Sequence, residues 1–272
     1  MHLVRKVFER YPFIFGVYTY LTIIKVTLAL FKVKMTDAKL LQNMFSAIAI
    51  LTDEATFNIT PDNIQLRTMD PSRVAMVDFQ WPKTIFDEYQ ADQPQKICIN
   101  IGELLKLLRR TTRDETVELT LTPETPKLNI TITGRYTRTF NMPTLEPQEE
   151  ETPMPKITFK TTIKTTTDGL RQAIEDAQIV SDHVRIEADT EQLTLTATGD
   201  LMGATIILKK GSDALLDIQT QESTKATYSL SYLVEIIKAA AATSEITTIQ
   251  FANDMPIQLD FHQPKEGKLT YY

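Results

Sequence analysis

Four aspartates near the ends of expected strands are the side chains in this sequence most suited to acid–base or metal chemistry. They are Asp70, Asp78, Asp189 and Asp200. Nothing in their spacing places two carboxylates together, and Asp70 followed by proline is typical of a turn. Ser72 and Ser181 have no histidine in the pattern of a nucleophilic triad. We interpret these side chains as turn and cap residues, and we expect no enzymatic activity.

The cysteine and the histidines indicate no metal site. Cys98 is the only cysteine, so no internal disulfide can form and a reducing compartment is expected. His2, His183 and His262 lie far apart in the sequence and show no metal-ligand spacing. The eight glycines include no phosphate-binding loop. We therefore expect neither a metal nor a cofactor.

A row of basic side chains could contact a polyanion. Its members have the i, i+3, i+4, i+7 spacing of one helix face and are Lys106, Arg109, Arg110 and Arg113. Such contacts attract phosphates without reading bases. The 272-residue chain has a formal net charge of −6, so contact with DNA would have to come from a local face. An ordinary solvated helix face is the alternative.

The segment 66–81 joins two alternating strands through a short Asp-Pro-Ser-Arg link. Met69, Val74 and Met76 lie in or beside this link. A loop that exposes apolar side chains is typical of a docking surface, because solvent favours polar residues there. The alternative is an ordinary loop with Met69 and Val74 packed into the core.

Four segments carry apolar residues at helical spacing and predict the helices that would position these side chains. They are 37–51, 100–110, 167–180 and 229–242. The helix starts are 63 residues apart in the first half (37 to 100) and 62 in the second (167 to 229), which indicates an internal duplication. Alternating segments predict strands at 117–122, 127–133, 156–164, 192–198 and 257–261. The pattern predicts an α+β fold of antiparallel sheets with helices on one face.

A segment rich in proline and glutamate, 142–158, separates the two halves. Its composition predicts an extended, solvated connector. Met154 and Ile157 are apolar residues that this connector would carry across the surface. We therefore expect a first domain at 31–141 and a second domain at 159–272.

Residues 1–30 do not fit the pattern of the remaining chain. The apolar run 11–31 is long enough for a membrane span or signal anchor, but Lys25 interrupts it, at a cost of roughly 2.5–3.5 kcal/mol on insertion scales. An extra ordered strand or helix is a second interpretation. We favour a third, a misassigned start with the protein beginning near Leu30, because the globular pattern begins at Phe31.

Four short motifs are the most specific pieces of the sequence. They are Asp53-Glu54-Ala55, Met69-Asp70-Pro71-Ser72-Arg73-Val74, Pro153-Met154-Pro155 and Gly267-Lys268-Leu269-Thr270-Tyr271-Tyr272. Together with the duplication, the connector and the basic helix face, they resemble the PCNA family of DNA polymerase sliding clamps in its archaeal form, over 31–272. The resemblance implies a DNA-clamp fold that assembles into a ring of three subunits around duplex DNA.

The resemblance also implies a function and partners. It implies a non-enzymatic processivity factor for replication and repair that needs no cofactor. Its partners would be double-stranded DNA, the clamp loader, DNA polymerase, flap endonuclease and DNA ligase. The expected location is cytoplasmic, associated with the nucleoid.

Roles for individual residues follow from the same resemblance. The helices would line the hole of the ring and present Lys39, Lys106, Arg109, Arg110, Arg171 and Lys238 to DNA. Partner peptides with a glutamine and an aromatic pair would bind a pocket of Met69, Arg73, Val74, Met76, Met154, Pro155, Ile157, Pro256 and Tyr272. Edge strands 136–142 and 204–209 would join subunits through Tyr136, Arg138, Phe140, Thr205, Ile207 and Lys209.

The sequence departs from the family pattern at both ends, and alternatives stay open. Family chains continue past the paired tyrosines with a Leu-Ala-Pro segment, so we interpret the C-terminal tail as missing after Tyr272. One subunit of a heterotrimeric clamp is the nearest alternative. A protein anchored in a membrane through 11–31 is another. A metal-dependent hydrolase would require Asp70 to meet Asp189 or Asp200.

Overall fold

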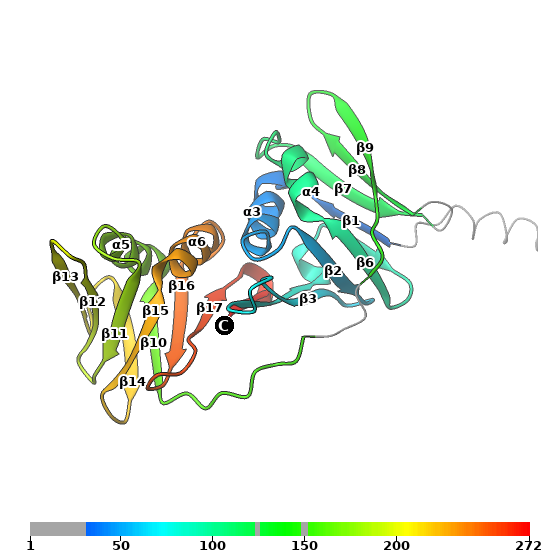
Figure 1. The fold of residues 1–272 in the computed structure, drawn as a ribbon. Helices are drawn as coiled ribbons and strands as arrows, with labels where there is room; N and C mark the ends of the chain where they lie inside the picture. Colours follow the sequence, from blue (N-terminus) through cyan, green and yellow to red (C-terminus); the bar gives the residue numbers. More distant parts are fainter. Residues whose placement is uncertain (1–30, 123–125, 148–151) are drawn as a thin grey trace, which may run out of the picture.

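The computed structural model describes residues 31–122, 126–147 and 152–272. These residues form three antiparallel sheets and four α-helices. The four helices follow the concave side of the molecule, and strands form the opposite side (Figure 1). The α+β fold with helices on one face, predicted from the sequence, is therefore confirmed.

The first half holds two of the helices. Its elements are β1 (Phe31–Met35), α3 (Ala38–Ile48), β2 (Glu54–Ile59), β3 (Asn63–Met69), β4 (Met76–Pro82), η1 (Lys83–Ile85), β5 (Glu88–Ala91), β6 (Gln95–Asn100), α4 (Ile101–Leu108), β7 (Thr116–Leu121), β8 (Lys127–Thr133) and β9 (Thr137–Pro143). Strands β5-β1-β7-β8-β9 form one five-stranded sheet in that order.

The second half repeats this plan after the connector. Its elements are β10 (Thr161–Thr166), α5 (Thr167–Gln178), β11 (His183–Ala188), β12 (Gln192–Thr198), β13 (Gly203–Lys209), β14 (Leu215–Thr220), β15 (Thr224–Ser229), α6 (Leu230–Ala240), β16 (Ile246–Phe251), β17 (Gln258–His262), η2 (Pro264–Glu266) and β18 (Lys268–Tyr271). Strands β13-β12-β11-β15 form a four-stranded sheet.

Three of the four helices begin at polar side chains that accept hydrogen bonds from otherwise unpaired backbone N–H groups, whereas Ser229 at the start of α6 makes no such bond. Asp37 accepts from the Leu40 amide at the start of α3. Asn100 and Thr166 do the same for α4 and α5. All four predicted helices are confirmed, but each ends earlier than expected; α4, for example, stops at Leu108.

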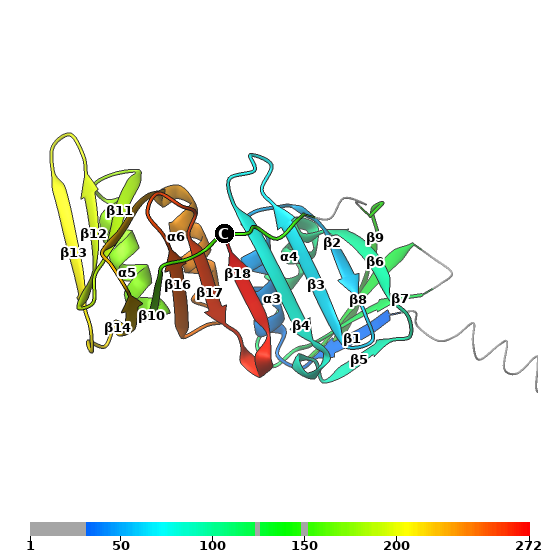
Figure 2. The same ribbon diagram turned by 90° about the horizontal axis from the view of Figure 1, so that it is seen from below.

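One nine-stranded sheet joins the two halves. Its order is β14-β10-β16-β17-β18-β4-β3-β2-β6, so β18 of the second half pairs with β4 of the first (Figure 2). The register places Leu269 opposite Phe79 and Tyr271 opposite Val77. The domain boundary is therefore crossed by continuous backbone hydrogen bonding, which fixes how the halves sit relative to each other.

Side chains reinforce this junction on both faces of the sheet. Asp78 of β4 is nearly buried and pairs with Lys268 of β18 at 2.5 Å and with Arg67 of β3 at 3.1 Å. On the helix side, the Tyr271 hydroxyl donates to the Ala47 carbonyl of α3 at 2.6 Å. The two halves are thus joined by polar contacts as well as by the sheet.

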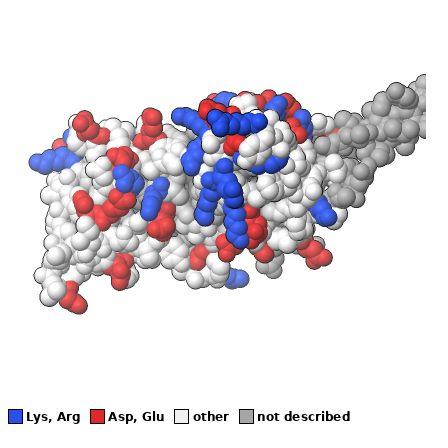
Figure 3. All heavy atoms as spheres, turned by 90° about the horizontal axis from the view of Figure 1, so that it is seen from above, with Lys and Arg blue, Asp and Glu red and all other residues white. Residues whose placement is uncertain are grey.

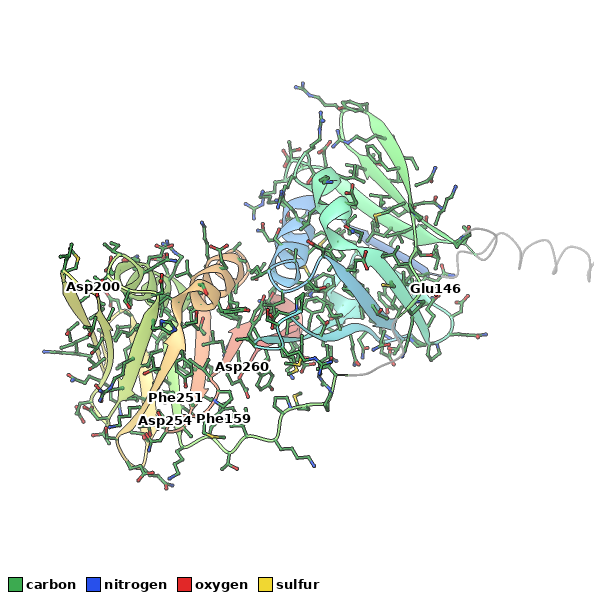
Figure 4. All side chains as sticks on the ribbon, in the orientation of Figure 1. Glu146, Phe159, Asp200, Phe251, Asp254 and Asp260 are labelled. Atoms are coloured by element: carbon green, nitrogen blue, oxygen red, sulfur yellow. The ribbon has the colours of Figure 1, made fainter. Side chains whose placement is uncertain are left out.

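The connector differs from the expected strand at 156–164. The strand β10 begins only at Thr161, and 152–160 contains no regular element. Prolines lack the N–H that a strand ladder needs, and two of them stand at 153 and 155. Figure 4 shows the connector leaving the first half near Glu146 and reaching the second half near Phe159.

Most other strand predictions are confirmed. Strands β8 and β12 have the predicted bounds, while β7 and β17 are each displaced by one residue at both ends. The predictions for 1–30 lie outside the described residues. Within the described ranges, no helix is long and apolar enough to cross a membrane.

Candidate functional site

The four helices form one uninterrupted surface across the domain boundary. Helix α3 packs against α4 on one side and against α6 on the other, and α6 packs against α5. The Asn43 side-chain amide donates to the Ala242 carbonyl at 3.4 Å, which links α3 directly to the end of α6. The order α4-α3-α6-α5 therefore presents a single continuous face.

The basic residues singled out in the sequence lie in or next to these helices. Exposed are Lys39, Lys106, Arg109, Arg110 and Lys238, whereas Arg171 is partly exposed. Figure 3 shows Lys and Arg side chains gathered over the first half, while basic and acidic side chains alternate over the second half. The positive charge of the helix face is therefore concentrated in the first half.

Ion pairs neutralise part of this charge. In the second half, Arg171 is held between Asp168 at 2.5 Å and Glu175 at 2.8 Å. Hydrogen bonding from the Arg171 guanidinium holds the pKa of the Asp168 carboxyl below its usual value. In the first half, Lys106 pairs with Glu103 at 2.5 Å. These pairs reduce the charge that Arg171 and Lys106 offer to an external anion.

Four of the six cations remain available for an external anion. Among the described residues, no ion pair to a carboxylate is formed by Lys39, Arg109, Arg110 or Lys238. Lys39 donates only to the neutral side-chain amide oxygen of Gln42, at 2.9 Å. Arg109 is the C-cap of α4, and Arg110 follows it. Flexible, exposed cations of this type attract phosphates without fixing them in one geometry.

A small apolar pocket of about 120 Å³ lies across the boundary between the halves. Its lining comprises Val74, Ala75, Tyr228, Ser229, Tyr232, Leu233, Ile236, Pro256, Ile257, Leu259, Tyr271 and Tyr272. Burial raises the pKa of the Tyr228 hydroxyl, which donates to the Met255 carbonyl at 2.9 Å. The pocket is therefore an apolar hollow with aromatic walls, suited to an aromatic or aliphatic side chain.

The structure brings together only some of the residues assigned to this pocket. Val74, Pro256 and Tyr272 line it, and Val74 is 63 % exposed at its rim. Met69, Arg73, Met154, Pro155 and Ile157 do not belong to the lining of the described cavity.

The assignment of Met76 to the pocket was wrong. Met76 was expected beside the exposed link, but it is 3 % exposed and begins strand β4. Its backbone exchanges two hydrogen bonds with Tyr272, at 3.0 and 2.9 Å, which turns the segment into sheet rather than loop. The exposed apolar residue of the link is Val74 alone.

Sequence reasoning missed most of the wall contributed by the second half. Tyr228, Tyr232 and Ile257 were not assigned to the pocket, although Tyr232 lies in the predicted helix 229–242. The sequence signal for Tyr232 was that an aromatic residue lies between the apolar and the polar face of this helix. Tyr232 lies near Val74 only because β4 pairs with β18, and a pairing between segments so far apart cannot be predicted from a local sequence pattern.

Strands β9 and β13 are two of the edge strands of the described sheets. Strand β9 pairs only with β8, and strand β13 pairs only with β12. Each edge exposes apolar side chains: Tyr136 and Phe140 are 64 % and 37 % exposed, and Ile207 is 49 % exposed. Arg138 is tied to Glu115 at 2.8 Å within the same half. Thr205 and Lys209 are exposed on β13. An unpaired edge with apolar residues is a template for pairing with another chain.

Three of the four aspartates considered for catalysis, Asp70, Asp78 and Asp189, have structural partners, and Asp200 is exposed. Asp70 accepts hydrogen bonds from its own loop and from Tyr232, and Asp189 accepts from the Glu191 and Gln192 amides of a turn. In the part of the chain that the structure describes, no group of three or more His, Cys, Asp or Glu could hold a metal ion.

Comparison with known proteins identifies the family. The models of the N-terminal and C-terminal domains of proliferating cell nuclear antigen match residues 30–144 and 153–272. The DNA polymerase sliding clamp of Pyrococcus furiosus is 35 % identical over 241 residues, covering 89 % of this chain and 96 % of that protein. DNA polymerase sliding clamp 1 of Pyrobaculum aerophilum is 34 % identical over 236 residues, covering 87 % and 94 %.

Solved structures agree with this match. The PCNA of Thermococcus kodakaraensis superposes with a TM-score of 0.84 at 25 % identity, covering 89 % of this chain and 98 % of that one. The PCNA2–PCNA3 complex of Sulfolobus tokodaii gives a TM-score of 0.82 at 28 % identity, covering 89 % and 97 %. The fold is that of the sliding-clamp proteins. This chain belongs to the proliferating cell nuclear antigen family, and the resemblance found in the sequence is confirmed.

Proposed function

We propose that this protein is a sliding clamp: several subunits close into a ring around duplex DNA and tether replication and repair enzymes to it. The continuous α4-α3-α6-α5 face, with an unpaired strand edge in each half, is the observation that supports this proposal most directly. Closure through the edges would place all helices on the inside. The role is non-catalytic, in keeping with aspartates that are occupied by turn amides.

Charge supports sequence-independent contact with DNA. The available cations, Lys39, Arg109, Arg110 and Lys238, sit on exposed positions of the helix face or just beyond α4. They supply phosphate attraction but no rigid donors for base edges. A ring that holds DNA by topology needs no more than this, because sliding requires contacts that break easily.

The edge strands support closure by copies of this chain. Strand β9 would pair with β13 of the next subunit, and Tyr136 and Phe140 would meet the side of the sheet that carries Ile207. Each subunit would then use both β9 and β13, so these two edges would be paired in the ring, while β5 and β15 would stay at the ends of the joined sheet.

The boundary pocket supports binding of partner enzymes. Its aromatic wall and its exposed Val74 rim suit a peptide that inserts an aromatic side chain as a buried anchor. We assign this role to peptide segments of DNA polymerase, flap endonuclease, DNA ligase and the clamp loader.

Native mass spectrometry of the full chain at low micromolar concentration tests the ring. A mass of three chains is expected, and a monomer would contradict closure by identical copies. Rings reassembled from diluted subunits in the presence of closed circular plasmid should co-elute with it and be released when one restriction cut makes it linear. Equal release before and after the cut would contradict topological binding.

A subunit of a mixed clamp is the second candidate. The match to a Sulfolobus tokodaii complex of two different PCNA chains supports it. A persistent monomer that forms a ring only when related chains from the same cell extract are added would favour this alternative over the homotrimer.

A further inference from the structure

The loop 70–75, at the rim of the boundary pocket, is organised around one carboxylate. Asp70 is 6 % exposed and accepts four hydrogen bonds. Its Oδ1 atom accepts from the backbone amides of Val74 and Ala75, both at 2.7 Å. Its Oδ2 atom accepts from the Ser72 amide at 2.9 Å and from the Tyr232 hydroxyl at 3.1 Å. A carboxylate with four donors is fully engaged, so the loop has one well-defined conformation.

The backbone of this loop needs such a support. Arg73 has φ +57°, in the left-handed region that residues other than glycine rarely adopt. The Asp70 amide donates to the Ala75 carbonyl at 2.9 Å, and the Arg73 amide donates to the Asp70 carbonyl at 3.0 Å. These bonds close the loop on itself and turn Val74 outward, where its side chain is 63 % exposed on the pocket rim.

The fourth donor comes from the other half of the molecule. Tyr232 lies in α6, and its ring lines the same pocket as Val74. The Asp70–Tyr232 hydrogen bond therefore connects the rim contributed by the first half to the aromatic wall contributed by the second. One carboxylate holds both sides of the hollow at a fixed separation.

We propose that Asp70 is the positioning residue of the partner pocket: it presents Val74 and fixes the distance from Val74 to the Tyr232 wall, without touching the bound peptide itself. This inference rests on the proposed peptide-binding function of the pocket. From the sequence alone, Asp70 is predicted only to begin a turn; the inference gives it a role in peptide recognition as well.

The titration behaviour of the carboxyl agrees with this geometry. Burial by itself raises the pKa of Asp70, but the hydrogen bonds from Ala75, Val74, Ser72 and Tyr232 outweigh it and lower the pKa below the usual 3.8. The group is therefore ionised at neutral pH and acts as an acceptor for all of its donors.

Asp70→Asn in the full chain is the decisive variant, because it keeps the size of the side chain and replaces one acceptor oxygen by an amide donor. A synthetic peptide with a glutamine followed by an aromatic pair serves as the probe. We expect its Kd to rise on the order of tenfold by calorimetry, and Tyr232→Phe, which removes only the bond between the halves, to cause a smaller rise. Asp189→Asn is the matched control, since Asp189 also accepts two turn amides but lies away from the pocket.

A double-mutant cycle separates positioning from general destabilisation. If Asp70 acts through Val74, Asp70→Asn should weaken peptide binding less in a Val74→Ala background than in the unaltered chain. Equal losses in both backgrounds, or a loss as large for Asp189→Asn, would overturn the proposal.

Hydrogen exchange tests the loop without any peptide. The Val74 and Ala75 amides should exchange slowly in the unaltered chain and faster in Asp70→Asn, while Asp189→Asn leaves them unchanged. Unaltered exchange in Asp70→Asn would overturn the positioning role. If the unaltered chain binds no peptide although these amides are protected as expected, the proposed pocket fails while the loop geometry stands.

Discussion

Tyr271→Phe tests how the two halves are held together. The Tyr271 hydroxyl donates to the Ala47 carbonyl at 2.6 Å, and Tyr271 is 1 % exposed. Ala47 lies in the last turn of α3, where carbonyl groups have no partner within the helix. The substitution therefore leaves a buried carbonyl unpaired, while the ring and its edge-to-face contact with Phe261 at 5.8 Å are kept.

The size of the effect follows from the lost hydrogen bond. Leaving one buried polar group unpaired costs about 1–3 kcal/mol, and the retained ring creates no large cavity. For a chain of this length each kcal/mol lowers Tm by roughly 2–4 °C. At neutral pH we expect Tyr271→Phe to lower the free energy of unfolding by about 2 kcal/mol and Tm by roughly 4–8 °C.

The difference in stability between the unaltered chain and Tyr271→Phe should also depend on pH. Burial raises the pKa of the Tyr271 hydroxyl well above the usual 10.0. Above pH 10.0 the unfolded chain therefore loses this proton while the folded chain keeps it. Stability then falls as pH rises, by about 1.4 kcal/mol per pH unit from this residue. Tyr271→Phe lacks this loss, so the two proteins should approach each other in stability at alkaline pH.

Chemical denaturation near neutrality and at several values above pH 10.0 provides the measurement. The protein concentration must be fixed, because association of subunits adds to apparent stability. The unaltered chain at the same concentration is the reference. The reasoning fails if Tyr271→Phe is no less stable than the unaltered chain near neutrality, or if the difference does not shrink above pH 10.0.

Three further predictions concern the proposed surfaces. Val74→Glu puts a charge on the pocket rim and should abolish binding of the aromatic peptide, measured by calorimetry. The number of subunits seen in native mass spectrometry should not change. An unchanged affinity for the peptide would refute the pocket. Replacing Arg109 and Arg110 by alanine should reduce the slope of log affinity for DNA against log salt by about 2, measured by fluorescence anisotropy; an unchanged slope would place the phosphate contacts elsewhere. Ile207→Glu on β13 should dissociate the ring in native mass spectrometry, whereas Leu216→Glu on β14, with a similar exposure of 43 %, should not. Equal masses for these two variants would argue against closure through β13.

The helices could be predicted from the sequence because their signals are local. Apolar spacing marks the buried face, and the structure shows Asp37 and Asn100 as the caps of α3 and α4. The predicted C-terminal ends of the helices were less accurate, because a helix stops where its capping geometry is satisfied and the apolar spacing can continue beyond that point. The expected strand at 156–164 was right for 161–164, which lie in β10, and wrong for 156–160, where period-two alternation continues through a segment that begins beside prolines.

The pocket could be predicted only in part because it is assembled from both halves. Val74 was recognisable as an apolar residue in a polar link, and Tyr272 came from the family resemblance. Tyr228 and Tyr232 join them through the β4–β18 pairing, a contact between segments far apart in sequence. Asp70 was interpreted correctly as a turn residue, but its bond to Tyr232 is visible only in three dimensions.

Two of the residues that join the halves also shape the pocket. Tyr271 fastens α3 and lines the hollow, and Asp70 bonds to α6 while presenting Val74. A peptide that fits this hollow binds only the docked arrangement, so it must stabilise docking by RT ln(1 + [L]/Kd), about 2.7 kcal/mol at a hundredfold excess over Kd. That is comparable to the single hydrogen bond of Tyr271. On the proposed function, partner binding and a rigid junction within each subunit would therefore reinforce each other.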